Sequence, residues 1–400
     1  MRIWDYLVVG GGIVGCSIAR QLKSTHAEKE VVVLEKEAAV GSHSSGRNSG
    51  VIHSGINQKP GSLKARLCVR GGRLLKEFCR ANQVPTKEVG TVVLARTIQE
   101  CEVLRELQRR ANANEVPSVE ILDPYQLKAV EPYAKAKEAL LAPTGGIVDS
   151  RKFVAEVARN AATRGVSFAY DTRVRKIIDR ADHLDVETTK SHYSTKFLIN
   201  CAGLYADQVA WMMDVGLDYC IIPFRGDYYR LRPERSHLVK SMIFPPPNLD
   251  LPFLGVHLTR KTDESVIVGP NASLALGREK YRDAKINWQE TLRMLLDLRF
   301  TRLMSDRKFL HLALEELRLS TSKEEFAKAA RSLGPDIRSQ DLIPSESAIR
   351  AQLVNKKGNF VEDVTYTKTD KSLHVLSGSS PGMTSALAFA EEVDTIVCRD

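Results

Sequence analysis

The chain has 400 residues, of which 43% are hydrophobic, and a formal net charge of +9. This length exceeds that of one hydrophobic core, so we expect two domains, and the apolar content is that of an ordinary globular protein. No apolar run approaches the roughly 18 residues that span a bilayer, so a transmembrane helix is not expected. The basic charge is dispersed and accompanies no recognised nucleic-acid-binding motif. It therefore indicates solvated surface charge or attraction to an anionic substrate or lipid, with no nucleic-acid partner.

The seven cysteines include no CxxC pair. An odd number without metal-ligand spacing predicts reduced thiols in a cytoplasmic protein, and neither a disulfide framework nor a metal site. An apolar strand begins by Asp5, which leaves no room before it for a signal peptide, so we expect none.

The first 36 residues carry the strongest functional signal. A strand over 5–9 is followed by a glycine turn at 10–15 and by a helix that begins at about residue 14. A second strand over 31–34 then ends at an acid, Glu35. Gly10 permits the tight turn, Gly12 lets the backbone approach a pyrophosphate, and Gly15 lets the helix pack on the sheet. The helix start at Ile13 and Val14 offers unpaired N–H groups to phosphates, and Glu35, followed by Lys36, lies where a carboxylate binds ribose hydroxyls. The unit predicts a bound adenine dinucleotide, whereas a bare glycine string would indicate only a turn.

Hydrophobic periodicity and turn residues predict the remaining elements. Helices are expected over 71–82, 98–112, 124–130, 151–164, 288–317 and 384–397, with Asp149 or Ser150 capping the fourth. Strands are expected over 89–95, 166–170, 174–179, 184–189, 197–200, 224–231, 253–258, 265–268 and 373–376. Because the chain returns to a strand, a glycine turn and a helix at its end, we expect one α/β domain assembled from discontinuous segments.

Longer motifs carry a resemblance to a known family. They are SSGRNSGVIHSG (44–55), KPGSLKA (59–65), NCAGLYAD (200–207), PFRGDYY (223–229), LPFLGVHLTR (251–260), GPNA (269–272), IRAQ (349–352) and SPGMT (380–384). The opening resembles flavoproteins of the D-amino-acid oxidase and glycerol-3-phosphate dehydrogenase superfamily. The later motifs, in order along nearly the whole chain, closely resemble the L-2-hydroxyglutarate dehydrogenase family.

The resemblance implies non-covalent FAD as the cofactor. The residues it implies for FAD binding, together with those of the N-terminal unit, are Gly10, Gly12, Ile13, Val14, Gly15, Glu35, Lys36, Ser44, Ser45, Arg47, Asn48, Ser49, Gly50, Val51, Ala202, Gly203, Gly378, Pro381, Gly382, Met383 and Thr384. The last five precede a helix, so the backbone N–H groups there, which Pro381 lacks, could stabilise negative charge on a reduced flavin. Without the resemblance, the same glycines would equally suit a simple helix start.

Oxidation of a 2-hydroxy acid needs an anchored carboxylate, a proton acceptor and an α-hydrogen that faces flavin N5. His53 is expected at the flavin, as the base or as a ring contact, although a loop histidine bonded to backbone fits too. His257 is expected on a strand, where its side chain lies on the same face as that of Thr259. It is either part of a substrate wall or an ordinary sheet histidine. Arg350 occupies the position where superfamily members place a carboxylate-binding arginine. Arg260, Lys64 and Tyr228 are unranked candidates for a second carboxylate.

The expected activity is FAD-dependent oxidation of L-2-hydroxyglutarate to 2-oxoglutarate by hydride transfer to flavin N5, with the electrons passed to a quinone or another acceptor. Two alternatives are a superfamily amine oxidase for sarcosine, glycine or a related amino acid, and a non-catalytic flavin-binding redox sensor. We expect a Rossmann-like α/β FAD-binding domain from 1–86, 146–210 and 346–400. A second, α+β substrate domain with a mainly antiparallel sheet is expected from 87–145 and 211–345.

The segment 288–317 combines leucines with several arginines. Such a basic amphipathic helix either packs on the substrate domain or docks on a membrane surface. The protein is expected in the cytoplasm. In the second case it would also contact the inner face of the cell membrane peripherally.

Overall fold

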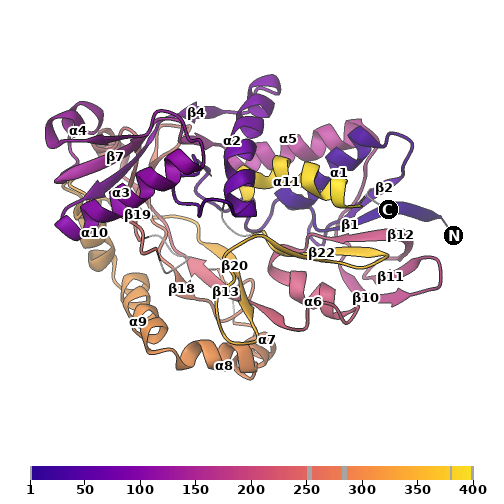
Figure 1. Cartoon of the computed structure of the whole chain (residues 1–400). Coiled ribbons are helices and arrows are strands. Elements are labelled where there is room, and N and C mark those ends of the chain that lie inside the picture. Colours follow the sequence, from indigo (N-terminus) through magenta and orange to yellow (C-terminus); the bar gives the residue numbers. More distant parts are fainter. Residues whose placement is uncertain (1, 250–254, 282–285, 379–380, 398–400) are drawn as a thin grey trace.

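A parallel sheet covered by helices forms one end of the molecule (Figure 1). The computed structural model describes residues 2–249, 255–281, 286–378 and 381–397. The parallel strands lie in the order β9, β2, β1, β12 and β22, and a hairpin of β10 and β11 and the strand β21 extend the sheet antiparallel. Their bounds are β1 Ile3–Val9, β2 Val31–Leu34, β9 Ser167–Ala169, β10 Val174–Asp179, β11 Leu184–Thr188, β12 His192–Asn200, β21 Thr365–Lys368 and β22 Ser372–Ser377.

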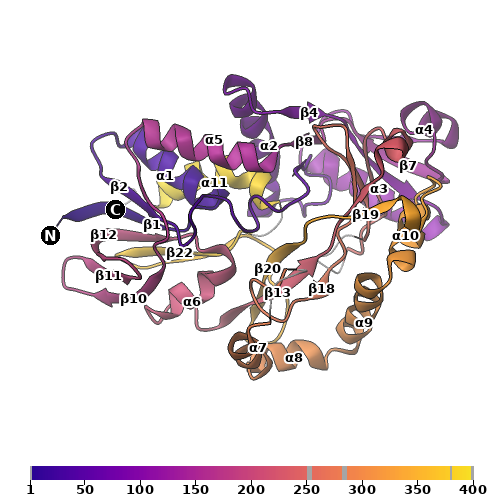
Figure 2. The same ribbon diagram turned by 180° about the vertical axis from the view of Figure 1, so that it is seen from behind.

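Four helices cover one face of this sheet, as Figures 1 and 2 show, and α6 lies on the other side. They are α1 Ile13–Thr25, α2 Leu63–Ala81, α5 Ser150–Thr163 and α11 Gly382–Val397, with α6 at Ala206–Trp211 after the short 3₁₀ helix Gly203–Tyr205. Leu22, Val33, Ile199 and Val393 are fully buried in the core between the helices and the strands. Burial of such side chains is the main stabilising term for this layer.

A second large sheet forms the other end of the molecule. Its order is β19–β14–β17–β16–β15–β5–β7–β6, and every pair except β15 with β5 is antiparallel. The bounds are β5 Thr91–Ala95, β6 Glu120–Leu122, β7 Glu138–Ala142, β14 Tyr229–Leu231, β15 Met242–Phe244, β16 Leu258–Arg260, β17 Val266–Val268 and β19 Leu342–Pro344. The helices α3 Ile98–Ala113, α4 Pro124–Val130 and α10 Lys323–Arg331 pack around it. The predicted fold class, a Rossmann-like sheet with a second, mainly antiparallel sheet, is confirmed.

Two small sheets lie between the large ones. One has the order β18–β13–β20, with bounds Ser273–Leu274, Tyr219–Gly226 and Ala348–Asn355, and the other β3–β8–β4, with bounds Val51–Ile52, Gly146–Val148 and Thr86–Glu88. Strand β20 belongs to the segment predicted for the first domain and pairs over its whole length with β13 from the segment predicted for the second. The two ends of the molecule therefore share a sheet, and the domain boundaries stay a prediction.

Two expected helices differ in detail from the structure. The segment 288–317 is three helices, α7 Trp288–Leu295, α8 Leu298–Ser305 and α9 Arg307–Thr321, because the Asp297 and Asp306 side chains cap new helix starts. Helix α2 begins eight residues before the expected start, where Ser62 caps it. Gly71 lies inside α2 because a Cβ there would lie 2.4 Å from the Thr384 carbonyl oxygen, so the glycine allows α2 to pack closely on α11.

Two expected strands also change. The strand predicted over 224–231 is divided between β13 and β14. Of the strand predicted over 253–258, residues 253 and 254 lie outside the described residues, and β16 begins only at Leu258. Within the described part of the chain, the structure contains no helix with the length and apolar character needed to cross a bilayer.

Candidate cofactor and active site

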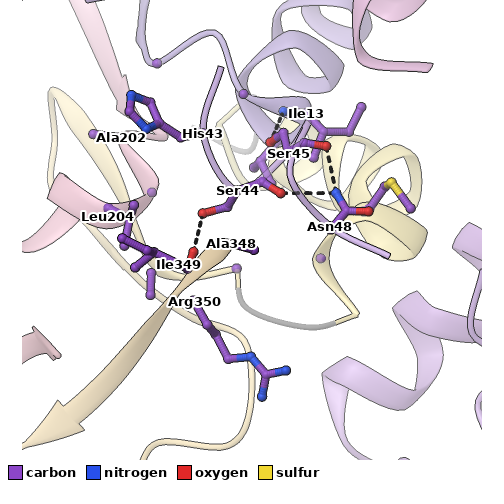
Figure 3. A pocket seen from close by; sticks show the side chains of 18 of the residues that line it. Ile13, His43, Ser44, Ser45, Asn48, Ala202, Leu204, Ala348, Ile349 and Arg350 are labelled. Atoms are coloured by element: carbon purple, nitrogen blue, oxygen red, sulfur yellow. Dashed lines mark hydrogen bonds between the residues drawn. The ribbon is translucent and has the colours of Figure 1, made fainter. Parts of the chain in front are cut away.

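One elongated cavity, with about 360 Å³ of internal space, runs from the β1–α1 corner to β20 and the start of α11. Its walls come from segments far apart in sequence, among them 41–51, 201–205, 224–228, 270–272, 348–351 and 381–384. Figure 3 shows the middle of this cavity, where Ser44, Ser45 and Asn48 lie beside Ile13, and Arg350 projects from β20. The cavity therefore lies along the carboxyl ends of the parallel strands, the usual ligand position of open α/β sheets.

The glycine corner closes the cavity at the start of α1. Gly10 has a φ of +109°, and a Cβ there would lie 2.5 Å from the Cys201 carbonyl oxygen. A Cβ on Gly15 would lie 2.0 Å from the Gly10 carbonyl oxygen, so these two glycines are required by the fold itself. Gly12 differs, since a Cβ there would project into the cavity and meet only the Ser45 hydroxyl, at 3.1 Å.

The first turn of α1 faces the cavity without a side-chain cap of its own, because its N-cap residue is Gly12. The Ile13 N–H donates to the Ser45 hydroxyl, at 3.0 Å. Helix starts of this kind bind anions through free N–H groups and the helix dipole. The corner thus has the chemistry of a pyrophosphate site.

The loop 44–50 is held on both sides of the cavity. The Ser44 hydroxyl donates to the Ile349 carbonyl oxygen on β20, at 2.7 Å. Asn48 donates to the Ser45 carbonyl oxygen, at 2.7 Å, and accepts from the Gly50 N–H, at 2.8 Å (Figure 3). These bonds fix the distance between the α1 corner and β20, so the loop joins the predicted cofactor end to the predicted substrate end.

Glu35 ends β2 inside the cavity wall. Its carboxylate is buried and accepts from the Gly11 N–H, at 2.7 Å, and from the Glu37 N–H, at 2.8 Å. Two backbone donors orient the carboxylate while its remaining lone pairs stay available to a ligand. This arrangement fits the predicted contact with ribose hydroxyls.

A short segment after β18 crosses the same end of the cavity. Glu279 accepts from Lys36, at 2.6 Å, and from the Tyr205 hydroxyl, at 2.8 Å. Burial opposes ionisation of Glu279, but these two hydrogen bonds hold its pKa below the usual value. The Tyr281 hydroxyl bonds His43 Nδ1, at 2.7 Å. Glu279, His43 and Glu37 could in principle hold a metal ion, but the Lys36 ammonium already lies among them, so we assign them no metal.

The opposite end of the cavity lies where α11 meets β3. The Thr384 hydroxyl accepts from the His53 N–H, at 3.1 Å. Thr384 is buried where α2 and α11 are in close contact. This bond fixes the backbone of His53, whose ring lines the cavity. Burial lowers the pKa of His53 to about 4, and the charges of neighbouring residues act in the same direction. The ring is therefore neutral near pH 7.

His257 lies just before β16, so the expected strand position is wrong, but the ring lines the cavity. The ring stacks on Phe244, with centroids 4.3 Å apart. His257 Nδ1 lies 3.0 Å from the Gly255 carbonyl oxygen, and a carbonyl only accepts, so Nδ1 carries the proton of the neutral ring. Burial lowers the pKa of His257 to about 4. Nε2 therefore has a free lone pair, as a general base requires.

Arg350 supplies the positive charge of the inner cavity. Burial lowers the pKa of its guanidinium, and its charge lowers the pKa of both His53 and His257. Tyr228 lies in the same wall, where burial raises its pKa to about 12, so its hydroxyl stays protonated. A cation, a neutral base and a hydroxyl donor thus surround one space. Together they suit an anionic substrate that gives up a proton.

Most residues predicted for the site line this cavity. They are His53, His257, Arg350 and Tyr228, and Gly10, Gly12, Ile13, Val14, Glu35, Lys36, Ser44, Ser45, Asn48, Ser49, Val51, Ala202, Gly203, Gly378, Pro381, Gly382, Met383 and Thr384. Gly15, Arg47 and Gly50 support the wall from behind, at the helix start and in the loop 44–50.

Three predicted substrate residues lie outside the cavity lining that the described residues form. Arg260 donates to the Val239 carbonyl oxygen, at 2.7 Å, and to Glu264. Lys64 donates to the Glu362 carbonyl oxygen, at 2.9 Å, and Thr259 is fully buried within the second sheet. Arg260 and Lys64 are thus bonded to groups outside the cavity, although the Lys64 charge is close enough to lower the pKa of His53.

The structure also brings in residues that sequence reasoning did not select. Arg173, His43, Phe244 and Asn271 line the cavity. Asn271 is the third residue of the GPNA motif, so the motif pointed to it, whereas Arg173 and His43 lie in loops without a local signature. These positions depend on tertiary structure and could not be read from spacing.

The sheet order, the glycine corner and the cavity define a dinucleotide-binding oxidoreductase fold. The family model described as "FAD dependent oxidoreductase" matches residues 5–395. The chain therefore belongs to the FAD-dependent oxidoreductase family, and its cofactor is FAD.

Relatives are similar over nearly the whole chain. An L-2-hydroxyglutarate dehydrogenase of Indibacter alkaliphilus is 37% identical over 98% of this chain and 98% of its own. The Escherichia coli K12 enzyme of the same name is 34% identical over 98% of this chain and 92% of its own. The predicted resemblance to that family is thus confirmed. Among solved structures, FAD-bound L-α-glycerophosphate oxidase from Mycoplasma pneumoniae superimposes on this chain with a TM-score of 0.82 and 22% sequence identity. The match covers 100% of this chain and 96% of the oxidase chain, and it shows that the two share a fold.

Proposed function

We propose that the protein oxidises L-2-hydroxyglutarate to 2-oxoglutarate with FAD as the oxidant. The observation that carries this proposal is the meeting of Arg350, Tyr228 and a neutral His257 in the cavity that begins at the glycine corner. The near full-length similarity to relatives named L-2-hydroxyglutarate dehydrogenase supports the choice of substrate. When bound, FAD supplies a flavin ring that accepts a hydride at N5.

The chain offers a seat for each part of FAD. We place the pyrophosphate at the α1 corner, against Gly12 and the Ser45 hydroxyl, since a Cβ on Gly12 would project into this space. The adenosine ribose is assigned to the Glu35 carboxylate, and the flavin end to the space between His53 and the α11 start. No residue is assigned a covalent bond to the cofactor, so denaturation should release FAD intact.

His257 is the proposed general base. Its Nδ1 donates to the Gly255 carbonyl oxygen, so Nε2 can accept the proton of the substrate hydroxyl as the α-hydrogen leaves. Phe244 holds the plane of the ring by stacking. His53, whose backbone is tied to Thr384, serves as a wall of the flavin space. Of the two roles expected for His53 from the sequence, base or ring contact, this assignment takes the second.

Arg350 is the proposed anchor of a substrate carboxylate. A desolvated guanidinium gains a strong charge-assisted bond when a carboxylate arrives. The same carboxylate neutralises the charge that lowers the pKa of His257, so binding makes the base stronger. Of the three candidates for the second carboxylate, only Tyr228 lies in the described cavity wall, and we assign it that contact.

The electrons are proposed to pass to a quinone or a similar acceptor, and the protein is proposed to work in the cytoplasm with peripheral contact to the membrane.

The FAD-binding domain is proposed to comprise 1–86, 146–210 and 346–400, and the substrate domain 87–145 and 211–345. Arg173 lines the adenosine end and brings positive charge to it, whereas the Lys36 ammonium there is paired with Glu37 and Glu279.

The test is anaerobic bleaching of the flavin. L-2-hydroxyglutarate should reduce the bound flavin in a single turnover with one equivalent of 2-oxoglutarate formed, and D-2-hydroxyglutarate should do much less. Faster reduction by sarcosine or glycine would replace this proposal by the amine oxidase. Absence of reduction by every acid in the panel, in protein that holds FAD, would favour the redox sensor.

A further inference from the structure

Helices α7, α8 and α9 form the lower rim of the molecule in both Figure 1 and Figure 2. In the described residues, 16 large apolar side chains are exposed, and eight of them lie on these three helices or, for Leu296, at the C-cap of α7. The eight are Trp288, Leu292, Leu295, Leu296, Leu298, Leu310, Leu314 and Leu317. Single exposed leucines are ordinary, but such a concentration in one segment marks an interaction surface.

The exposed side chains of α7 follow helical spacing. Trp288, Leu292 and Leu296 lie at i, i+4 and i+8, and 70%, 57% and 71% of each side chain is exposed. The inner side of α7 is marked by the buried Thr291 and by Met294, which packs against the core formed by β13 and α8. The apolar stripe of α7 therefore points away from the protein.

Helix α9 has two apolar faces. Phe309 and Leu312 pack inward against the core of β13 and β20. Leu310, Leu314 and Leu317, at i, i+4 and i+7, are about half exposed on the other side. Packing on the protein needs only one apolar stripe. Among the described residues, the second stripe belongs to no hydrophobic core cluster.

The charges around these leucines are mainly basic on the outside. Arg293, Arg302, Arg307, Lys308 and Arg318 are exposed. Of the acids on the same helices, Glu315 is exposed beside His311 and Asp306 is exposed at the start of α9, so five basic groups face two exposed acids, and the other acids are used inside the protein. Glu290 pairs with Arg278, Asp297 pairs with Arg299 and caps α8, Asp306 caps α9, and Glu316 is buried. The rim therefore combines an apolar surface with positive charge.

We propose that the α7–α9 rim docks the protein on an anionic bilayer surface. The helices would lie in the interface, with the leucine stripes at the acyl boundary and the arginines and Lys308 at the headgroups. Anionic lipid attracts such basic segments within a Debye length. A second copy of this chain fits less well, because a two-fold interface would bring the two basic rims together.

This inference rests on the proposed function and specifies which surface makes its membrane contact. The surface also lies close to the cavity. Glu316 on the inner side of α9 accepts from the Ala272 N–H, at 2.6 Å, and its carbonyl oxygen accepts from Asn271, at 3.3 Å. Asn271 and Ala272 line the cavity. A docked protein would thus hold its cavity one helix away from the bilayer, where a lipid-soluble acceptor is found.

The experiment is flotation of the FAD-loaded protein with vesicles. The probes are phosphatidylcholine alone and phosphatidylcholine with about one third phosphatidylglycerol, at low and at high salt. Leu296→Asp and Leu314→Asp should each weaken binding to the anionic vesicles about tenfold or more, because a charge replaces an inserted leucine. Ile98→Asp is the matched control, since Ile98 is 68% exposed on α3 and lies outside the rim, and it should bind like the wild type.

A second pair of variants tests the charge. Arg293→Glu combined with Arg318→Glu should weaken binding to anionic vesicles and reduce its dependence on salt. Flavin content and melting temperature show that each variant is folded. Failure of the wild-type protein to bind anionic vesicles would overturn the proposal, and so would equal loss in Ile98→Asp. A wild-type dimer in solution that the leucine variants dissociate, without vesicle binding, would assign the rim to a second copy instead.

The same variants separate this inference from the proposed catalysis. Without vesicles, anaerobic flavin reduction by L-2-hydroxyglutarate should be unchanged in Leu296→Asp and Leu314→Asp, since neither residue lines the cavity. Vesicle binding without flavin reduction would refute the catalytic proposal alone. Flavin reduction without vesicle binding would refute the docking surface alone.

Discussion

The pH dependence of flavin reduction is the sharpest test of the base assignment. Burial lowers the pKa of His257 to about 4, and the charge of Arg350 acts in the same direction, against the hydrogen bond to Gly255. A histidine with the ordinary pKa of about 6.5 would be only about 9% neutral at about pH 5.5. With a pKa of about 4, about 97% of the rings stay neutral at that pH. The two cases differ about tenfold in active base.

The assay is stopped-flow flavin reduction at low L-2-hydroxyglutarate, because the second-order rate constant reports groups of the free enzyme. The rate constant should stay nearly level from about pH 8 to about pH 5.5. An acid limb with a midpoint near 6.5 would refute the reasoning from burial.

Two variants serve as controls for this profile. His257→Gln should slow reduction by about 10² to 10⁴, the usual contribution of general base catalysis. His53→Gln should retain most of the rate, because His53 is assigned to the wall of the flavin space. A larger loss in His53→Gln than in His257→Gln, at equal flavin content, would return the role of base to His53.

Further outcomes follow from the same geometry. Arg350→Ala should raise the apparent KM for L-2-hydroxyglutarate roughly tenfold to a hundredfold in steady-state assays, with a smaller effect on the limiting rate. Gly12→Val should fold but lack flavin by absorbance, whereas Gly15→Val should lower the melting temperature, because its Cβ would meet the Gly10 carbonyl oxygen. His374 is fully buried with a pKa of about 4, so the unfolded state binds its proton first, and this residue alone should cost about 3 kcal/mol of stability in urea unfolding as pH falls from about 6.5 to about 4. The equally low pKa values of His53 and His257 add to that loss.

The sequence was sufficient where the structure depends on neighbours along the chain. The strands β1 and β2 and the helix α1 form one local unit, in which each glycine has a steric reason visible in its spacing. The loop motif around Ser44 and Asn48 is similarly local, and its residues line the cavity. The helix from 288 failed as a single element because capping by Asp297 and Asp306 outweighed a continuous apolar pattern.

Tertiary packing decided what the sequence left open. Nothing near Arg260 indicated that the carbonyl oxygens of Ser236 and Val239 would take its guanidinium. Gly71 suggested a helix start, whereas its role is a close contact with α11. Arg173 reaches the cavity only because β9 pairs with β2, a contact between residues far apart in the chain.

The strand β20 shows what the sequence motifs could not give, namely how the separately predicted residues are brought together. It pairs with β13, carries Arg350 into the cavity and accepts the Ser44 hydroxyl at Ile349. The loop proposed to hold the cofactor and the residue proposed to anchor the substrate are thereby held by adjacent residues of one strand. A shift of this strand by one residue would turn Arg350 out of the cavity, because successive side chains of a strand face opposite sides. The hydrogen bond from Ser44 therefore couples cofactor position to substrate position, which is the geometry that hydride transfer requires.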